Sequence, residues 1–239
     1  MEFNIIEMGK VISTNDVAAA GGYPHGTIIT ARSQTAGRGQ RGNRWESASG
    51  ENLMFSLVVR PAHIPPDRQF IISMMASLAA SDALRGTGVD CMLKWPNDLY
   101  VADRKIGGIL IEHSVMGMQL TSSIIGIGIN VGQTAFDSSL PNPTSVMLET
   151  GDSRIVSRQV LGNFCDAFAV RYGEDSHRLY EDYMARLWRG TGIHMFRTED
   201  EGEFAASVAR IDPATGVLTL SLEDGTKRDF RFKEVEFVL

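Results

Sequence analysis

The sequence contains only two cysteines, Cys91 and Cys165, in 239 residues, and no CxxC pair. This number and spacing argue against a disulfide framework or a structural zinc site and favour a reducing compartment. No apolar run reaches the roughly 18 residues of a membrane helix, and the first residues, MEFN, lack the basic and apolar regions of a signal peptide. We therefore expect a cytoplasmic protein that does not associate with a membrane.

Positive charge is also scarce. The 23 lysines and arginines are outnumbered by 29 aspartates and glutamates, which gives a formal net charge of −6. A general nucleic-acid-binding protein usually carries a basic excess, so we expect no nucleic-acid partner. Otherwise 43% hydrophobic and 22% charged residues are typical of a globular protein. The length allows one large core and a small second domain.

Hydrophobic patterning changes character near residue 190. Before it, strand-like and helical segments are mixed; after it, short alternating segments are separated by turn signals, which favours a small β-barrel. We predict an α+β fold with domains 1–189 and 190–239. Strands are expected at 3–6, 26–31, 52–60, 93–101, 106–111, 124–131, 204–210, 217–222 and 229–237, and helices after Ser13-Thr14-Asn15-Asp16 (one of the first three residues capping it), after Pro65-Pro66, and over 155–188 with a break at Gly173.

The segment Gly37-Arg38-Gly39-Gln40-Arg41-Gly42 matches G-x-G-x-x-G by letter. A dinucleotide-binding motif would open a helix, but this segment leads into another strand, so no helix N-terminus is available for a pyrophosphate. Glycines let backbone amides approach an anion, and guanidinium groups bind phosphate or carboxylate in bidentate fashion. We interpret this segment, called the glycine loop below (residues 37–42), as an anion-binding loop. The alternative is a solvated basic turn.

Three further segments combine charged residues with glycine or proline: Lys94-Trp95-Pro96-Asn97-Asp98, Lys105 before two glycines, and glycines 126 and 128 alternating along a strand. Each has a simpler explanation. Asn97-Asp98 can be a plain turn, Trp95 a core anchor, and Lys105 a strand-end residue. The alternating glycines weaken a strand unless something approaches its backbone, which favours a bound ligand.

In this order and spacing the four segments resemble the biotin–protein ligase family. The family loop G-R-G-R-x-G-R/N-x-W is similar to residues 37–45, and K-W-P-N-D is identical at 94–98. K-[LIV]-[AGS]-G-I-L-[IV]-E is similar to 105–112, and G-x-G-[IL]-N to 126–130. The resemblance spans nearly the whole chain. It implies a mixed-sheet, class II synthetase-like biotin/lipoate ligase catalytic domain followed by a small SH3-like β-barrel.

The resemblance also implies a two-step reaction. The carboxylate of biotin attacks the α-phosphate of ATP, which gives biotinyl-5′-adenylate and pyrophosphate; a lysine of a biotin carboxyl carrier protein then attacks the acyl carbon and AMP leaves. ATP and Mg²⁺ are the expected cofactors, with Mg²⁺ held through the ATP phosphates and by no metal site of the protein. Bifunctional members carry an N-terminal DNA-binding domain, for which strands beginning at Phe3 leave no room. We expect a monomer or weak homodimer without repressor function.

We assign Arg38, Lys94 and Lys105 to offset the negative charges of the first step; by resemblance, Arg38 and Lys105 hold the biotin carboxylate and the developing acyl-phosphate. Asp98 is our candidate for orienting or deprotonating the carrier amine, whose pKa is ordinarily near 10.4. Gln40 stands where many members carry arginine, so we expect faster escape of the adenylate. The residues expected at biotin and the adenylate are Ser13, Thr14, Asn15, Gln34, Gly37, Arg38, Gly39, Gln40, Lys105, Gly107, Gly108, Gly126 and Gly128; those expected at ATP are Arg41, Arg44, Trp45, Asn97 and Asn130.

Three other functions remain open. A lipoate–protein ligase or octanoyltransferase shares the catalytic fold, but the intact Lys94–Asp98 segment and the glycine loop favour biotin, and no cysteine lies in a motif to carry an acyl group. A non-catalytic binding module would not need Arg38, Lys94, Asp98 and Lys105 together. A DNA-binding regulator is disfavoured by the acidic charge.

Overall fold

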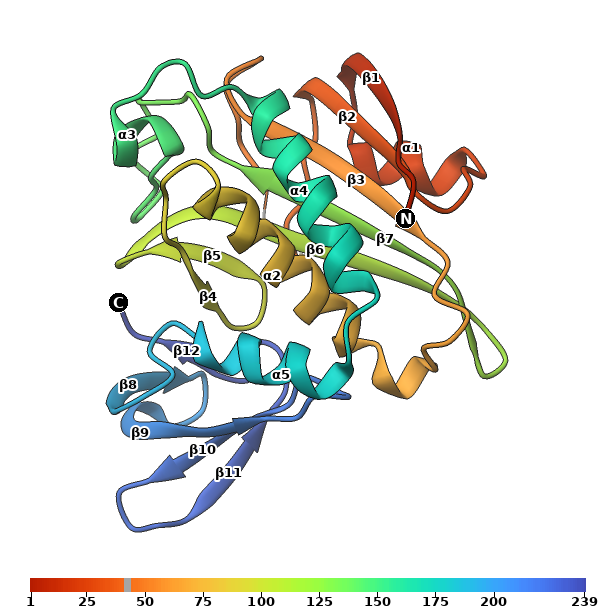
Figure 1. Cartoon of the computed structure of the whole chain (residues 1–239). Helices are drawn as coiled ribbons and strands as arrows, with labels where there is room; N and C mark the ends of the chain where they lie inside the picture. Colours follow the sequence, from red (N-terminus) through yellow and green to blue (C-terminus); the bar gives the residue numbers. More distant parts are fainter. Residues whose placement is uncertain (41–43) are drawn as a thin grey trace.

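The computed structural model describes residues 1–40 and 44–239, which form two β-sheets. The larger has seven strands in the order β1-β2-β3-β7-β6-β5-β4, and the smaller has five in the order β11-β10-β9-β8-β12. In Figure 1 the larger sheet lies behind helices α2 and α4, and the smaller sheet lies below α5. Strands β1 and β2 are parallel and the other neighbours antiparallel. The prediction of a mixed sheet in an α+β fold is therefore confirmed.

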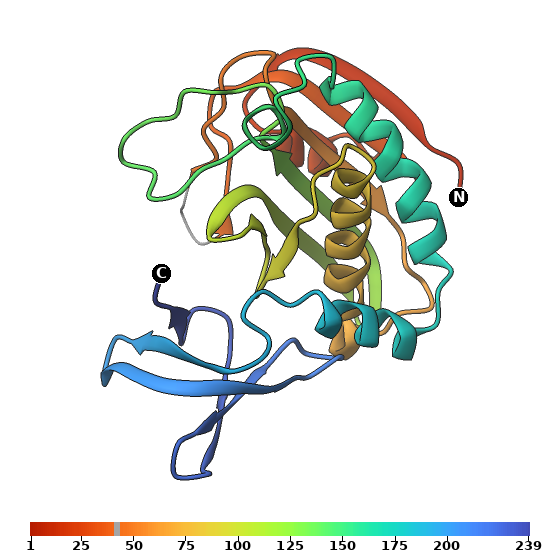
Figure 2. The same ribbon diagram turned by 60° about the vertical axis from the view of Figure 1, so that its left-hand side comes forward.

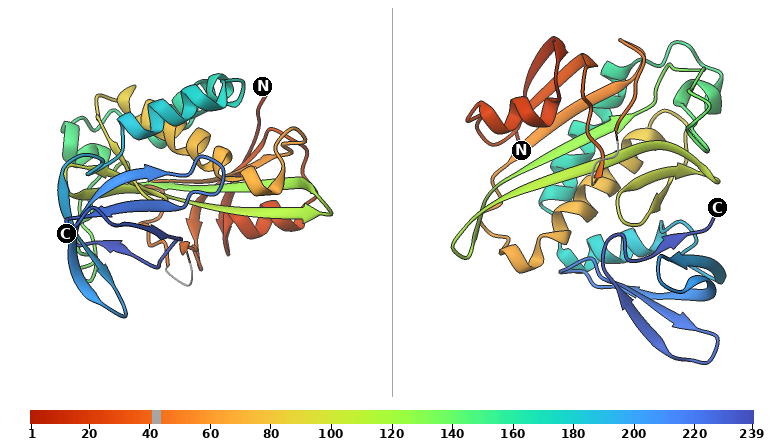
Figure 3. Two further views of the ribbon diagram at one scale, coloured as in Figure 1. Left: turned by 90° about the horizontal axis from the view of Figure 1, so that it is seen from below. Right: turned by 180° about the vertical axis from the view of Figure 1, so that it is seen from behind.

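The central strands of the larger sheet are covered on both faces. Every residue of β3 is buried, which explains its continuous apolar sequence LMFSLVV. Helices α2 and α4 cover one face (Figure 2), whereas α1 packs on the other, as the view from below shows (Figure 3). The strands of this sheet are β1 (Asn4–Val11), β2 (Thr27–Gln34), β3 (Leu53–Val59), β4 (Met92–Lys94), β5 (Asp98–Val101), β6 (Arg104–Met116) and β7 (Gln119–Ile129).

Helix α2 lies between the larger sheet and helices α4 and α5, so nearly all of its residues are buried. A short 3₁₀ turn over Pro66–Arg68 precedes it. None of the helices in the described part of the chain is long and apolar enough to cross a membrane. The helices are α1 (Thr14–Ala20), α2 (Phe70–Arg85), α3 (Val146–Thr150), α4 (Ser157–Tyr172) and α5 (Ser176–Ala185).

The smaller sheet is antiparallel throughout and packs against the larger part through aromatic side chains. The ring of Phe232 lies 6.1 Å from that of Phe70 and 5.5 Å from that of Trp95, and the Trp95 indole N–H donates to the Gly216 carbonyl at 2.9 Å. Apolar residues of both parts join in one buried cluster, so the boundary at 189/190 stays a prediction. Its strands are β8 (Ile193–Thr198), β9 (Gly202–Ile211), β10 (Leu218–Leu222), β11 (Lys227–Phe230) and β12 (Glu236–Phe237).

Several local predictions were wrong. Residues 93–101 do not form one strand: β4 and β5 are joined into a hairpin by a turn over residues 95–97. Residues 229–237 also form two strands, β11 and β12, while β8 and α3 were not predicted. Ser13 occupies the N-cap position of α1, but its side chain makes no capping hydrogen bond to the residues described. Nearby polar side chains instead bind one another across the sheet.

Candidate active site

A cavity of about 520 Å³ lies beside the start of α1, and all four of the sequence segments singled out above contribute to its lining. Its volume falls in the range typical of small-molecule sites. The expected residues that line it are Ser13, Thr14, Asn15, Gln34, Arg38, Gly39, Gln40, Arg44, Trp45, Lys94, Asn97, Asp98, Lys105, Gly108, Gly126 and Gly128.

Four expected residues are not placed at this cavity. A Cβ at Gly37 would lie 2.6 Å from the Trp45 carbonyl oxygen, and one at Gly107 would lie 2.9 Å from the Gly128 carbonyl oxygen, so both glycines allow close backbone packing. Asn130 is buried, and its side-chain amide donates to the Thr144 carbonyl at 2.9 Å. The structure therefore gives these three residues a packing role. The fourth, Arg41, lies outside the described residues.

Uncharged polar side chains form one part of the cavity lining. The Thr14 backbone N–H donates to Oε1 of Gln34 at 2.7 Å. The buried Ser56 hydroxyl lies 2.6 Å from Oδ1 of Asn15 and 2.8 Å from Oγ1 of Thr14. A Cβ at Gly126 would collide with Oδ1 of Asn15, so glycine makes room for this amide. Ser56 was missed in the sequence because it stands alone in an apolar strand.

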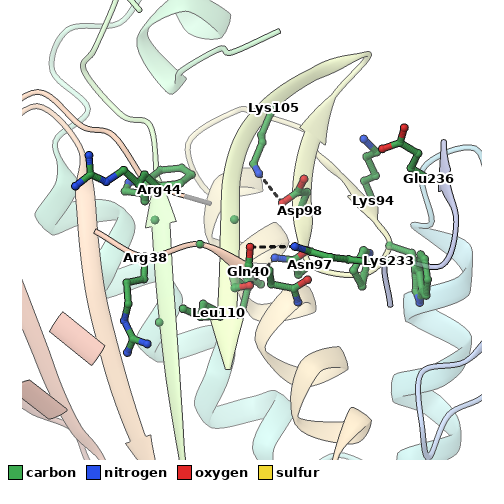
Figure 4. Close-up of a pocket in the computed structure, with 18 of the residues that line it drawn as sticks. Arg38, Gln40, Arg44, Lys94, Asn97, Asp98, Lys105, Leu110, Lys233 and Glu236 are labelled. Atoms are coloured by element: carbon green, nitrogen blue, oxygen red, sulfur yellow. Dashed lines mark hydrogen bonds and ion pairs between the residues drawn. The ribbon is translucent and has the colours of Figure 1, made fainter. Parts of the chain in front are cut away.

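Another part of the cavity lining is an ion pair. Nζ of Lys105 lies 2.7 Å from a carboxylate oxygen of Asp98, and Figure 4 shows the two side chains facing each other. A Cβ at Gly108 would lie 3.6 Å from this Nζ, so the glycine keeps the backbone open beside the charges. The backbone of Lys105 is held on both sides: its N–H donates to the Asn142 carbonyl at 2.7 Å, and its carbonyl accepts from the Thr144 N–H at 2.9 Å.

Lys94 also lines the cavity and lies among aromatic rings. Its Nζ donates to the Tyr100 hydroxyl at 3.0 Å and lies 4.5 Å from the centre of that ring and 5.3 Å from that of Trp188. Burial lowers the pKa of Lys94, which nearby Asp98 partly opposes. The aromatic faces offset part of the lost hydration of the ammonium group.

Arg38 is engaged by two carboxylates that were not among the expected site residues. Its guanidinium donates to Glu112 in bidentate fashion at 2.9 and 2.7 Å and lies 2.7 Å from Asp16. The hydrogen bond to Glu112 is the main reason that the pKa of Arg38 is raised. In Figure 4 the Arg38 side chain points away from Lys105. Arg38 and Lys105 therefore line the same cavity but pair with different carboxylates, Arg38 with Glu112 and Lys105 with Asp98.

The Trp45 ring packs on strand β7 at Gly128. A Cβ at Gly128 would collide with the indole, so a glycine is needed there. The indole N–H of Trp45 is buried and has no hydrogen-bond partner among the residues that the structure describes. Backbone pairing of Arg38 with Arg44 brings the two sides of the loop together.

The smaller sheet forms one wall of the cavity, which the sequence did not predict. The Nζ of Lys233 donates to the Gln40 carbonyl at 3.4 Å, so this wall reaches the glycine loop (Figure 4). Its strands look like ordinary alternating β segments, and only their docking places them at the site. The lining residues from this sheet are Arg197, Thr198, Glu199, Lys233, Glu234, Val235, Glu236 and Phe237.

The model of the biotin/lipoate A/B protein ligase family matches residues 8–130. The chain belongs to this family. It is 30% identical to the bifunctional ligase/repressor BirA of Bacillus spizizenii, over 94% of this chain and 71% of that protein. It is 33% identical to the biotin–[acetyl-CoA-carboxylase] ligase of Paracoccus denitrificans, over 68% of this chain and 70% of that protein. Family membership confirms the family and enzyme class predicted from the sequence.

The fold also matches solved structures. The biotin protein ligase from Aquifex aeolicus in complex with biotin and ATP superposes with a TM-score of 0.82 at 23% identity, over 98% of each chain. The chain spans smaller parts of other bifunctional relatives, 64% of BirA from Bacillus subtilis and 39% of BirA from Escherichia coli. The second, antiparallel sheet is consistent with the expected SH3-like domain.

Proposed function

We propose that this chain is an ATP-dependent biotin–protein ligase that forms biotinyl-5′-adenylate and then transfers biotin to a lysine of a biotin carboxyl carrier protein. The observation that carries the proposal is a cavity lined both by the uncharged polar side chains of Thr14, Asn15 and Gln34 and by the ion pair of Lys105 and Asp98. A ligand with a polar, uncharged ring system and a carboxylate matches both groups. Relatives named as biotin ligases support the choice of biotin.

In the first step, a carboxylate and a polyphosphate must approach each other. Lys105, Lys94 and Arg44 line the cavity and would offset the repulsion between these anions. The buried Trp45 indole N–H would be available to an acceptor on the nucleotide.

Mg²⁺ would enter with the nucleotide. The described residues contain no group of three or more His, Cys, Asp or Glu side chains that could hold a metal ion. We therefore propose that phosphate oxygens and water coordinate the ion, as is usual for Mg²⁺ bound with ATP. When bound, it would neutralise phosphate charge.

In the second step, Asp98 would orient or deprotonate the carrier lysine. For Asp98→Asn we expect transfer from preformed adenylate to slow at least about a hundredfold, the usual contribution of a general base, with a smaller effect on adenylate formation. Single-turnover transfer to a carrier domain measures this. Transfer at the wild-type rate would remove Asp98 from the mechanism.

The first experiment compares biotin, lipoate and octanoate in ATP-dependent pyrophosphate release, with and without a carrier domain. Release with biotin and labelling of the carrier lysine would support the proposal. Turnover with lipoate or octanoate would keep the fold and change the substrate, and no turnover would favour a binding module. The absence of repressor function, the monomeric or weakly dimeric state and the cytoplasmic location stay predictions; a gel shift at moderate salt tests DNA binding.

A further inference from the structure

A chain of polar contacts connects Arg38 to the uncharged polar side chains that line the cavity. It passes from Arg38 through β6, α1 and β3 to β2, so one loop residue and four strands or helices take part. In order along the chain of contacts, its members are Arg38, Glu112, Asn15, Ser56, Thr14 and Gln34.

Glu112 is the centre of this network because both of its carboxylate oxygens are used. Oε1 accepts from Nη1 of Arg38 at 2.9 Å, and Oε2 accepts from Nη2 of Arg38 at 2.7 Å and from Nδ2 of Asn15 at 2.7 Å. The carboxylate thus fixes the amide orientation of Asn15, whose Oδ1 accepts from the Ser56 hydroxyl. Without Glu112, Nδ2 of Asn15 loses its shorter, charged acceptor and keeps only the longer contact to the Leu110 carbonyl at 3.4 Å, so the amide is held less firmly.

The same contacts bear on the role of Arg38. Its guanidinium faces Glu112 and Asp16, two negative charges, and points away from the ion pair of Lys105 and Asp98 (Figure 4). In this arrangement two N–H groups of Arg38 are committed to Glu112, and its positive charge is already offset by two carboxylates. Lys105, by contrast, pairs with Asp98 in the lining of the cavity.

We propose that Glu112 is a positioning residue for the binding of biotin: it holds the Asn15 amide in its binding orientation and holds the Arg38 side chain by a bidentate pair. This proposal rests on the proposed function, since it names the means by which that site recognises its substrate. Lys105 is then the side chain that meets the ligand carboxylate.

Isothermal titration of biotin into wild type and Glu112→Ala tests this without turnover. We expect about a tenfold loss of biotin affinity, because Asn15 and Arg38 both lose a charge-assisted hydrogen bond. The KM for ATP should stay within about twofold and the Tm within about 4 °C, since a partly exposed pair contributes little to stability. Glu112→Gln, which keeps the shape and one acceptor, should lose less affinity; it also decides the matter if the alanine variant does not fold.

Two further variants separate positioning from direct contact. In an Asn15→Ala background, Glu112→Ala should cost clearly less than in the wild type, because the part of its effect that acts through Asn15 is already lost. Glu201→Ala is the matched control, since Glu201 makes a similar bidentate pair with Arg228, at 2.6 and 3.1 Å, outside the cavity lining. It should leave biotin affinity unchanged.

Three results of these titrations would contradict the proposals. Unchanged or tighter biotin binding in Glu112→Ala would overturn the proposal, and tighter binding would show that Glu112 competes with the ligand for Arg38. Full additivity with Asn15→Ala would also overturn it. Failure of the wild-type protein to bind biotin would refute the proposed function itself, and this is read from the wild type alone.

Discussion

Replacement of Lys105 by glutamine tests the role of the ion pair between Lys105 and Asp98 in the cavity. The Nζ of Lys105 lies 2.7 Å from Asp98, and its side chain is 36% exposed. Its removal takes away the cation and leaves the Asp98 carboxylate facing an incoming carboxylate. Two unit charges about 4 Å apart interact by about 4 kcal/mol at an effective dielectric constant of about 20, which corresponds to about a thousandfold in rate. Because solvent screens part of this, we expect kcat/KM for biotin to fall between about 10² and 10³.

The assay is biotin-dependent pyrophosphate release under kcat/KM conditions. Lys105→Arg keeps the charge and should retain at least about a tenth of the activity, since geometry alone is altered. Lys227→Gln removes an exposed lysine of β11 outside the cavity lining and should be neutral. A loss of less than about tenfold in Lys105→Gln would refute the assignment of this cation to the carboxylate and phosphate.

Three other changes have defined outcomes. Gln40→Arg adds a cation at the loop and should slow escape of biotinyl-adenylate, measured by its release into solution; an unchanged rate would contradict the reasoning. Gly128→Ala should displace the Trp45 indole and raise the KM for ATP, whereas Gly162→Ala, with open space around its Cβ in α4, should leave KM unchanged and raise stability slightly. Burial lowers the pKa of His113 below 6.5, so below about pH 6.5 the unfolded chain takes up the proton first and stability falls by at most about 1.4 kcal/mol per pH unit. His113→Gln should flatten this dependence in urea unfolding at pH 7.5 and 5.5; an unchanged slope would exclude His113 as its source.

The local motifs were predictable because each combines unusual residue types within a short segment. Glycine next to arginine or lysine, and Trp-Pro-Asn-Asp in a turn, have few purely structural reasons to occur together. The main strands of the larger sheet were predictable as well, since their β-branched runs are distinctive. The docking of the smaller sheet left no such signal, so the wall at Glu236 and Phe237 was missed.

Long-range pairing explains the remaining omissions. Glu112 faces Asn15 only because of the register of β6 and the position of α1 on the sheet. Ser56 of β3 reaches Thr14 only because α1 packs on that strand. A sequence motif does not encode such register. For the same reason, Asn130 was expected at the nucleotide from its motif, whereas its side chain binds the Thr144 carbonyl.

The wall formed by the smaller sheet has a consequence for synthesis of the protein. Ser13 and Phe237 both line the cavity, although almost the whole chain separates them in sequence. During translation, the loop, α1 and the larger sheet leave the ribosome while the cavity still lacks one wall. Contacts so distant in sequence form late and slow the folding of a domain. We therefore expect a nascent chain to hold its substrate only after strand β12 has emerged and docked.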